Sequence, residues 1–143
     1  SSKEALLSRL LDFFMPETAS APPKARARYI MRSCLVGLPL GGLVGASLVD
    51  GVPDKVLAVA PVLIIILVYE FSMLMRALDE LQFRIHMTAL ALSGGIGATL
   101  MTSWAILVAV DLAPRSDIEL IFGLPVLGLG YYAALFFVSR RYA

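Results

Sequence analysis

Charged residues are scarce in this sequence. Only 16% of its 143 residues are charged, against roughly 25% in soluble globular domains. Hydrophobic residues make up 59%, and the mean hydropathy is +0.83. A water-soluble chain of this length has too little polar surface to cover so much hydrocarbon. A membrane β-barrel would show alternating apolar residues in place of solid apolar runs. The sequence therefore predicts an all-α integral membrane protein.

Cysteine and histidine are almost absent, and this limits the chemistry. The single cysteine, Cys34, excludes an internal disulfide and a multi-cysteine metal site. The single histidine, His86, excludes a bis-histidine haem, and the chain has no phosphate-binding glycine loop and no HExxH motif. The net charge of +1 gives no strong field for nucleic acid. We expect no enzyme activity, no cofactor, no metal and no direct nucleic-acid binding.

An amphipathic helix is predicted for residues 1–15. Leucines and Phe14 recur at spacings of three and four, which places them on one face, and the charged residues lie largely on the other. These charges also interrupt the apolar run that a signal peptide needs. Three roles stay open: the helix lies in the membrane interface, docks onto a partner, or packs on the cytoplasmic ends of its own protein.

Residues 16–32 are predicted to form a basic linker. Pro22 and Pro23 oppose regular structure there, and Lys24, Arg26 and Arg28 make the segment basic. Such a cluster acts as a topology signal or attracts anionic lipid headgroups.

Four apolar stretches follow, and we expect them to form a four-helix transmembrane bundle within residues 33–143. Each is close to the roughly 20 residues that a helix needs to cross about 30 Å of hydrocarbon. The expected spans cover residues 33–49, 56–75, 87–110 and 118–138.

The basic residues predict the orientation of these spans. Ten of the twelve lysines and arginines lie before the first span, between the second and third, or after the fourth. Only Lys55 and Arg115 lie on the other side. The positive-inside rule therefore places both termini and the middle loop in the cytoplasm.

Glu70 lies inside the second apolar stretch, near its cytoplasmic end. A carboxylate within a span costs a few kcal/mol, so it usually faces a partner or a water-filled cavity. One hypothesis is a proton or cation site. The other, which its position favours, is a structural carboxylate paired with an arginine or hydroxyl of a neighbouring helix.

The segment between the second and third spans is charged and contains no glycine or proline. If it is helical, Arg76, Glu80 and Arg84 are spaced for a ladder of ion pairs. Together with Asp79, they either pair among themselves or offer a polar surface to a cytoplasmic partner. His86 follows at the membrane edge, where a hydrogen-bonding role is commoner than metal binding.

Small residues recur at helical spacing in three of the spans, among them Gly130 and Ala134 in the fourth. Gly37, Gly41 and Gly45 are each four residues apart, as are Gly94 and Ala98. This spacing allows close approach of another helix. Packing within the bundle is the first expectation for these residues, and oligomerisation through the first span is the second.

The second half of the chain resembles a family of uncharacterised four-helix proteins of the bacterial inner membrane. The resemblance lies in Arg76-Ala-Leu-Asp-Glu-Leu-Gln82, followed by Arg84-Ile85, and in the closing Ser139-Arg-Arg-Tyr142. The chain departs from the family pattern at Phe83 and His86. Members of that family are often encoded beside small helix-turn-helix regulators, so the resemblance implies a cytosolic regulator as partner.

Three functions follow from these features. The first is a non-catalytic regulatory or accessory membrane protein that engages a cytoplasmic or membrane partner through its cytoplasmic face. The second is a small proton-coupled transporter that uses Glu70. The third is a structural subunit of a larger membrane complex, and a homodimer is a further candidate assembly.

Overall fold

The regular elements of the described chain are all helical. The computed structural model describes residues 1–49, 53–115 and 123–142. The elements in chain order are α1 (Ser2–Phe14), the 3-10 helix η1 (Pro16–Thr18), α2 (Pro23–Ser47), α3 (Asp54–Leu57), α4 (Ala60–Arg76), α5 (Glu80–Ala109) and α7 (Gly123–Tyr142). The predicted all-α class is confirmed.

Four helices within the described residues are long and apolar enough to span a membrane. They are α2 with 25 residues, α3 and α4 together with 23, α5 with 30 and α7 with 20. At 1.5 Å per residue, 20 residues reach about 30 Å, the thickness of the bilayer hydrocarbon. Each expected span overlaps one of these helices, and the first residues of the fourth, 118–122, lie outside the described residues.

The prediction of an irregular linker at residues 16–32 is wrong in its second half. The first long helix begins at Pro23, so the basic residues that follow lie on its first turns. Proline is well tolerated at the first helical position because the N–H that it lacks would have no helical partner there. The two prolines therefore start a helix where the sequence analysis expected them to prevent one.

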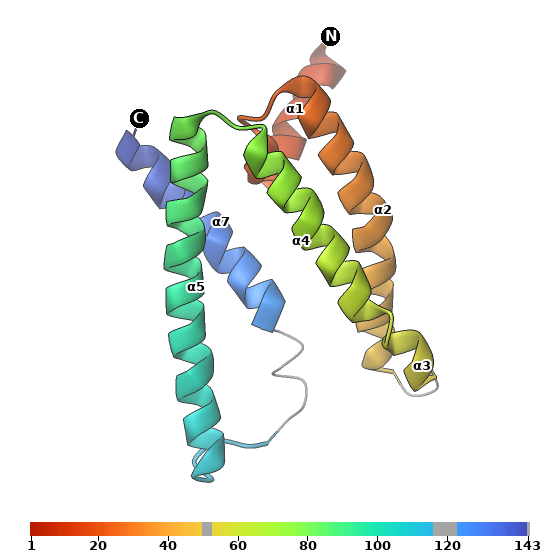
Figure 1. Ribbon diagram of the computed structural model, residues 1–143, viewed down its shortest axis with the longest axis vertical. Coiled ribbons are helices and arrows are strands. Elements are labelled where there is room, and N and C mark those ends of the chain that lie inside the picture. The colour runs from red at the N-terminus through yellow and green to blue at the C-terminus, as the bar shows by residue number, and fades with distance from the viewer. Residues whose placement is uncertain (50–52, 116–122, 143) are drawn as a thin grey trace. The chain divides into compact units, whose positions relative to one another are not determined.

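Residues 1–79 form one compact unit. Within it, α2 and α4 pack side by side, as Figure 1 shows, and α3 contacts α2. Helix α1 is joined to α2 through η1, and contacts η1 more than any other element. The best buried apolar side chains are Leu74 and Met75, near the end of α4.

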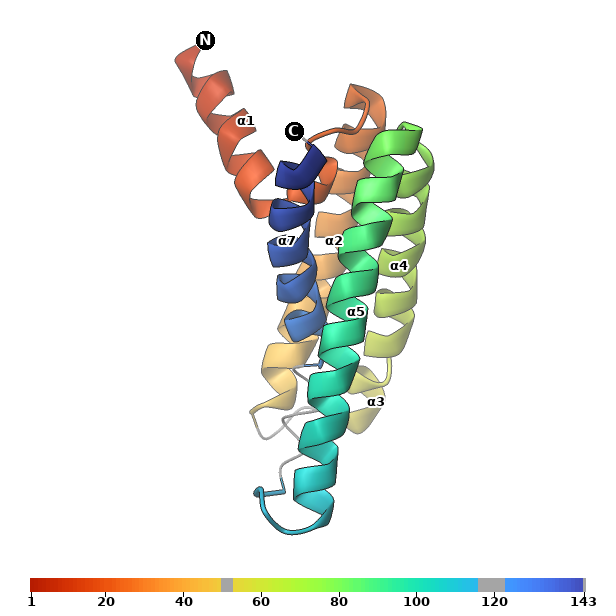
Figure 2. The ribbon, with the colours of Figure 1, turned by 90° about the vertical axis from the view of Figure 1, so that its left-hand side faces the viewer.

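Residues 80–143 form the second compact unit, in which α5 packs along α7 (Figure 2). Its buried apolar side chains are Ile85 and Ala89 on α5, with Tyr131, Leu135 and Val138 on α7. At the far end of α5, Asp111 has a left-handed backbone with φ of 58°. Aspartate tolerates that conformation better than most residues, and it ends the helix there.

Large apolar side chains cover the outside of the long helices. Leu38 on α2 is 77% exposed, and Ile65 on α4, Ile96 on α5 and Leu129 on α7 are exposed as well. Scattered exposed apolar residues are ordinary, but contiguous apolar helix surfaces of this extent are not stable in water. A lipid environment removes that cost.

Candidate functional site

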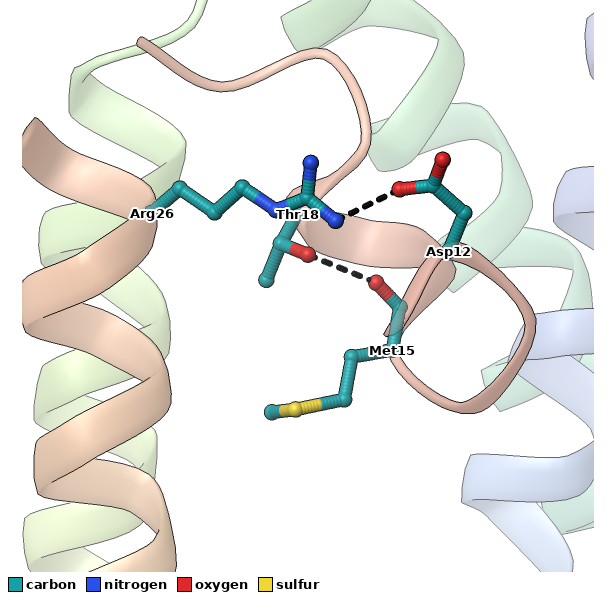
Figure 3. Close-up of polar contacts among 4 residues, drawn as sticks. All are labelled: Asp12, Met15, Thr18 and Arg26. Carbon is teal, nitrogen blue, oxygen red and sulfur yellow. Dashed lines mark hydrogen bonds and ion pairs between the residues drawn. The ribbon is translucent and has the colours of Figure 1, made fainter. Parts of the chain in front are cut away.

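A polar cluster joins the end of α1 to the first turns of α2. The Arg26 guanidinium lies 2.5 Å from Oδ1 of Asp12. Figure 3 shows this pair beside Thr18, whose hydroxyl donates a hydrogen bond of 2.8 Å to the Met15 carbonyl. The cluster therefore fixes the turn that follows α1 against α2.

Glu17 is a buried member of this polar cluster. Its side chain is buried, and the Tyr29 hydroxyl donates to its Oε1 over 3.3 Å. Thr18 beside it is fully buried. Buried polar groups are costly unless they are hydrogen-bonded, so these contacts specify one arrangement of η1 on α2.

Glu70 lies within α4 and pairs with an arginine on the neighbouring helix α2. Its side chain is only 7% exposed, and its Oε1 lies 3.2 Å from Nη1 of Arg32 on α2. Arg32 keeps 44% of its side chain exposed, so the pair is buried on one side and hydrated on the other. Of the two roles that the sequence left open for Glu70, the pairing with an arginine of a neighbouring helix is present.

A small cavity opens beside this pair. Its volume is about 170 Å³. It is lined by Ala25, Arg28, Tyr29, Glu70, Met73, Leu74 and Ala77. Ligand pockets usually exceed about 300 Å³, whereas a water occupies roughly 30 Å³ of liquid. The cavity therefore suits a few waters or a small ion, which would meet a carboxylate, a guanidinium and a phenol.

The predicted ladder of charges between the second and third spans is only half formed. Glu80 and Arg84 pair at 3.2 Å on α5. Arg76, however, ends α4, and the chain turns before Glu80 begins α5. The turn is closed by the backbone N–H of Ala77, which donates to Leu74. Arg76 and Glu80 are thus not on successive turns of one helix, and Asp79 lies in the turn itself.

The start of α5 also carries an open face of mixed character. A shallow hollow along this helix is lined by Glu80, Phe83, Arg84, Met87, Thr88, Ala91 and Leu92. On this face, the charged side chains of Glu80 and Arg84 lie beside the large apolar side chain of Phe83.

His86 forms a buried hydrogen bond within the second unit. Its Nδ1 lies 2.6 Å from the Tyr131 hydroxyl, and the two residues are only 2% and 5% exposed. The phenol donates when the imidazole proton is on Nε2 and accepts when it is on Nδ1. Sequence analysis missed Tyr131, because no spacing rule links residues 45 positions apart. Among the described residues, no three His, Cys, Asp or Glu side chains lie close enough to hold a metal ion.

Of the small residues that the sequence singled out in α5 and α7, Gly130 packs closely, whereas Gly94 and Ala98 do not. A Cβ at Gly94 would meet nothing within 4 Å, and Ala98 is exposed. The contact of α5 with α7 uses Ala89, Ser93 and Gly97 instead, one residue earlier in register. Ser93 donates to the Leu127 carbonyl at 2.7 Å. Gly94 and Ala98 therefore do not contribute to the contact of α5 with α7.

The glycines of the first span are also open. A Cβ at Gly37, Gly41 or Gly45 would meet nothing within 4 Å. Within the first unit, this stripe is therefore not the surface on which α4 packs, so the expectation of packing inside the bundle is not met there.

Comparison with known proteins adds no relative. No protein-family model, no curated protein and no solved structure matches this chain.

Proposed function

We propose that this chain is a non-catalytic integral membrane protein with a regulatory or accessory role, which binds a partner protein at its cytoplasmic side. The observation that carries this proposal is the first turn of α5. There the exposed pair of Glu80 and Arg84 flanks exposed Phe83. Aromatic residues and arginine are enriched in protein interfaces, and the rim around an apolar interface core is polar.

The proposed orientation of the spans puts this surface of α5 on the cytoplasmic side of the membrane. Basic residues gather at the start of α2, the end of α4, the start of α5 and the end of α7. The positive-inside rule assigns those helix ends to the cytoplasm, and the four long apolar helices support insertion in a bacterial inner membrane. The partner is then a cytosolic protein, for which the family resemblance favours a helix-turn-helix regulator, or another membrane subunit.

Co-purification from native membranes in mild detergent tests the proposal. The full chain is tagged and compared with the double variant Glu80→Ala with Phe83→Ala. A matched control on the same helix is Thr99→Ala with Ser103→Ala, since both hydroxyls are exposed and bond only to their own helix. We expect the wild type and the control to retain a partner that the first variant loses. The same partner on all three, or none on any, contradicts the proposal.

The native mass in the same detergent separates the possible assemblies. A monomer with one cytosolic partner, a homodimer and a larger membrane complex each give a different particle mass. A fixed stoichiometry with several membrane subunits would favour a structural subunit over a regulator.

A second function, a small proton-coupled transporter, is favoured by one observation. The cavity beside Glu70 is large enough for water and lies next to a carboxylate within an apolar helix. Flux in liposomes decides between the two. The transporter hypothesis requires proton-coupled flux that Glu70→Gln abolishes and Lys24→Gln leaves in place, since Lys24 is exposed and does not line the cavity. Absence of flux in the wild type excludes it.

A further inference from the structure

Helix α1 presents an apolar face that the unit of residues 1–79 leaves uncovered. None of its residues is buried. Its large apolar side chains are exposed, and Phe13 reaches 76%. The uncovered set comprises Leu6, Leu7, Leu10, Phe13 and Phe14. Within the unit of residues 1–79, α1 therefore does not bury this face, and the face is open to another occupant.

The contact that holds α1 uses its opposite side. At 100° per residue, Asp12 lies across the helix from the apolar face. Its carboxylate binds Arg26 at the start of α2, as Figure 3 shows. Because the polar side is turned toward α2, the apolar side is turned away from the unit that α1 belongs to.

The chain also holds α1 close to the start of α2, a candidate membrane span. Only residues 15–22 separate its end from α2, and buried Glu17 and Thr18 anchor that connection to the first unit. Eight residues extend at most about 28 Å, and this connection is partly helical, so its reach is shorter. An apolar helix face at that distance from the start of a span can reach the membrane interface.

The charged side chains beside the apolar face of α1 indicate what kind of surface this face binds. Lys3 and Arg9 lie on α1 itself, and Lys24 and Arg28 are exposed on the first two turns of α2. A row of basic side chains next to exposed leucine and phenylalanine matches anionic headgroups above hydrocarbon. We propose that α1 lies in the interface of an anionic bilayer, with its leucines and phenylalanines in the acyl region and Asp12 fixing its rotation. This inference rests on the proposed membrane insertion.

Depth-dependent quenching in proteoliposomes tests the inference on the full chain. With Cys34→Ala as background, single cysteines at Leu10, Ser8 and Leu38 carry an environment-sensitive fluorophore. The vesicles contain phosphatidylcholine and phosphatidylglycerol, with nitroxide on the acyl chains. We expect the probe at Leu10 to be quenched about threefold more than the probe at Ser8, since the apolar face alone enters the hydrocarbon. Adding Phe13→Glu should reduce the difference between the two probes.

The probe at Leu38 separates the two proposals. It lies on the exposed surface of α2, so it must be quenched if that helix spans the bilayer. Quenching at Leu38 with equal, weak quenching at Leu10 and Ser8 overturns the inference about α1 and points to a protein partner for its face. Absence of quenching at Leu38 overturns membrane insertion itself.

Discussion

The glycines of α2 lie on open helix surface, whereas Gly97 and Gly130 of the α5–α7 pair lie against side chains of the partner helix. In the first pair, a Cβ added at Gly41 would meet no atom within 4 Å. In the second, a Cβ at Gly97 would collide with the Leu127 side chain, and one at Gly130 would lie 2.8 Å from the Ser93 hydroxyl. The same residue type thus lies on open surface in the first pair and, at Gly97 and Gly130, in close contact with the partner helix in the second.

The polar contacts of the two pairs differ as well. An ion pair between Arg32 and Glu70 joins α2 to α4. A neutral hydrogen bond between His86 and Tyr131, and another from Ser93 to a main-chain carbonyl, join α5 to α7. Close packing of small residues suits a helix pair in lipid, where there is little hydrophobic drive between helices. The first pair depends more on one charged contact, and the second more on shape.

The largest expected effect comes from filling the close approach of α5 and α7. In Gly97→Val, the added side chain collides with Leu127, and we expect a loss of about 3 kcal/mol in the free energy of unfolding. Gly95→Val is the matched control, because a Cβ there meets nothing within 4 Å. Thermal unfolding of both variants in detergent measures the difference. Equal losses would show that helix propensity, and not the contact, causes the effect.

Removing the charge partner in the first pair should have the next largest effect. Arg32→Met leaves the Glu70 carboxylate buried without its cation, at a cost of about 2 kcal/mol, reduced by the hydration of the exposed side. The double variant with Glu70→Gln should recover most of that loss. Arg28→Met, on the same helix without an ion pair to Glu70, serves as control. A double variant no more stable than Arg32→Met would argue against the pairing.

The hydrogen bond of the second pair should contribute less. Tyr131→Phe leaves the buried His86 nitrogen without its phenol, and we expect a loss of about 1 kcal/mol. Tyr142→Phe removes an exposed hydroxyl from the same helix and should change the free energy of unfolding little. If both tyrosines give the same result, the contact between His86 and Tyr131 does not contribute to stability.

The smallest effect, and one of opposite sign, is expected on the open face of α2. Gly41→Ala meets no neighbour and raises helix propensity, so it should stabilise the chain by up to about 1 kcal/mol. The oligomeric state in mild detergent is measured alongside. A destabilised or dissociated variant would show that the glycine stripe of α2 is an interface between chains.

Much of the helical framework could be predicted from local pattern, and the main error had a local cause. Long apolar runs indicated each long helix, since hydropathy is a property of contiguous residues. The start of α2 was missed because Pro22 and Pro23 were taken to prevent a helix, although proline at the first position favours one.

The sequence could not show which small residues of α5 pack against α7, and the reason is a different one. Helix α5 carries two small-residue stripes one position apart, and both satisfy the spacing rule. Only the rotation of α5 against α7 decides that Ser93 and Gly97 face the partner helix while Gly94 does not.

By itself, the sequence determined the helical class, the positions of the long apolar helices and the uneven distribution of basic residues. The tertiary structure alone decided the partners: Arg32 with Glu70, 38 residues away, His86 with Tyr131, and Asp12 with Arg26. Local periodicity determines which residues share a helix face, but the packing of whole helices decides which faces contact each other. Helix α1 illustrates this difference. The sequence pattern predicted its apolar face, and the contact of Asp12 with Arg26 showed that this face points away from α2.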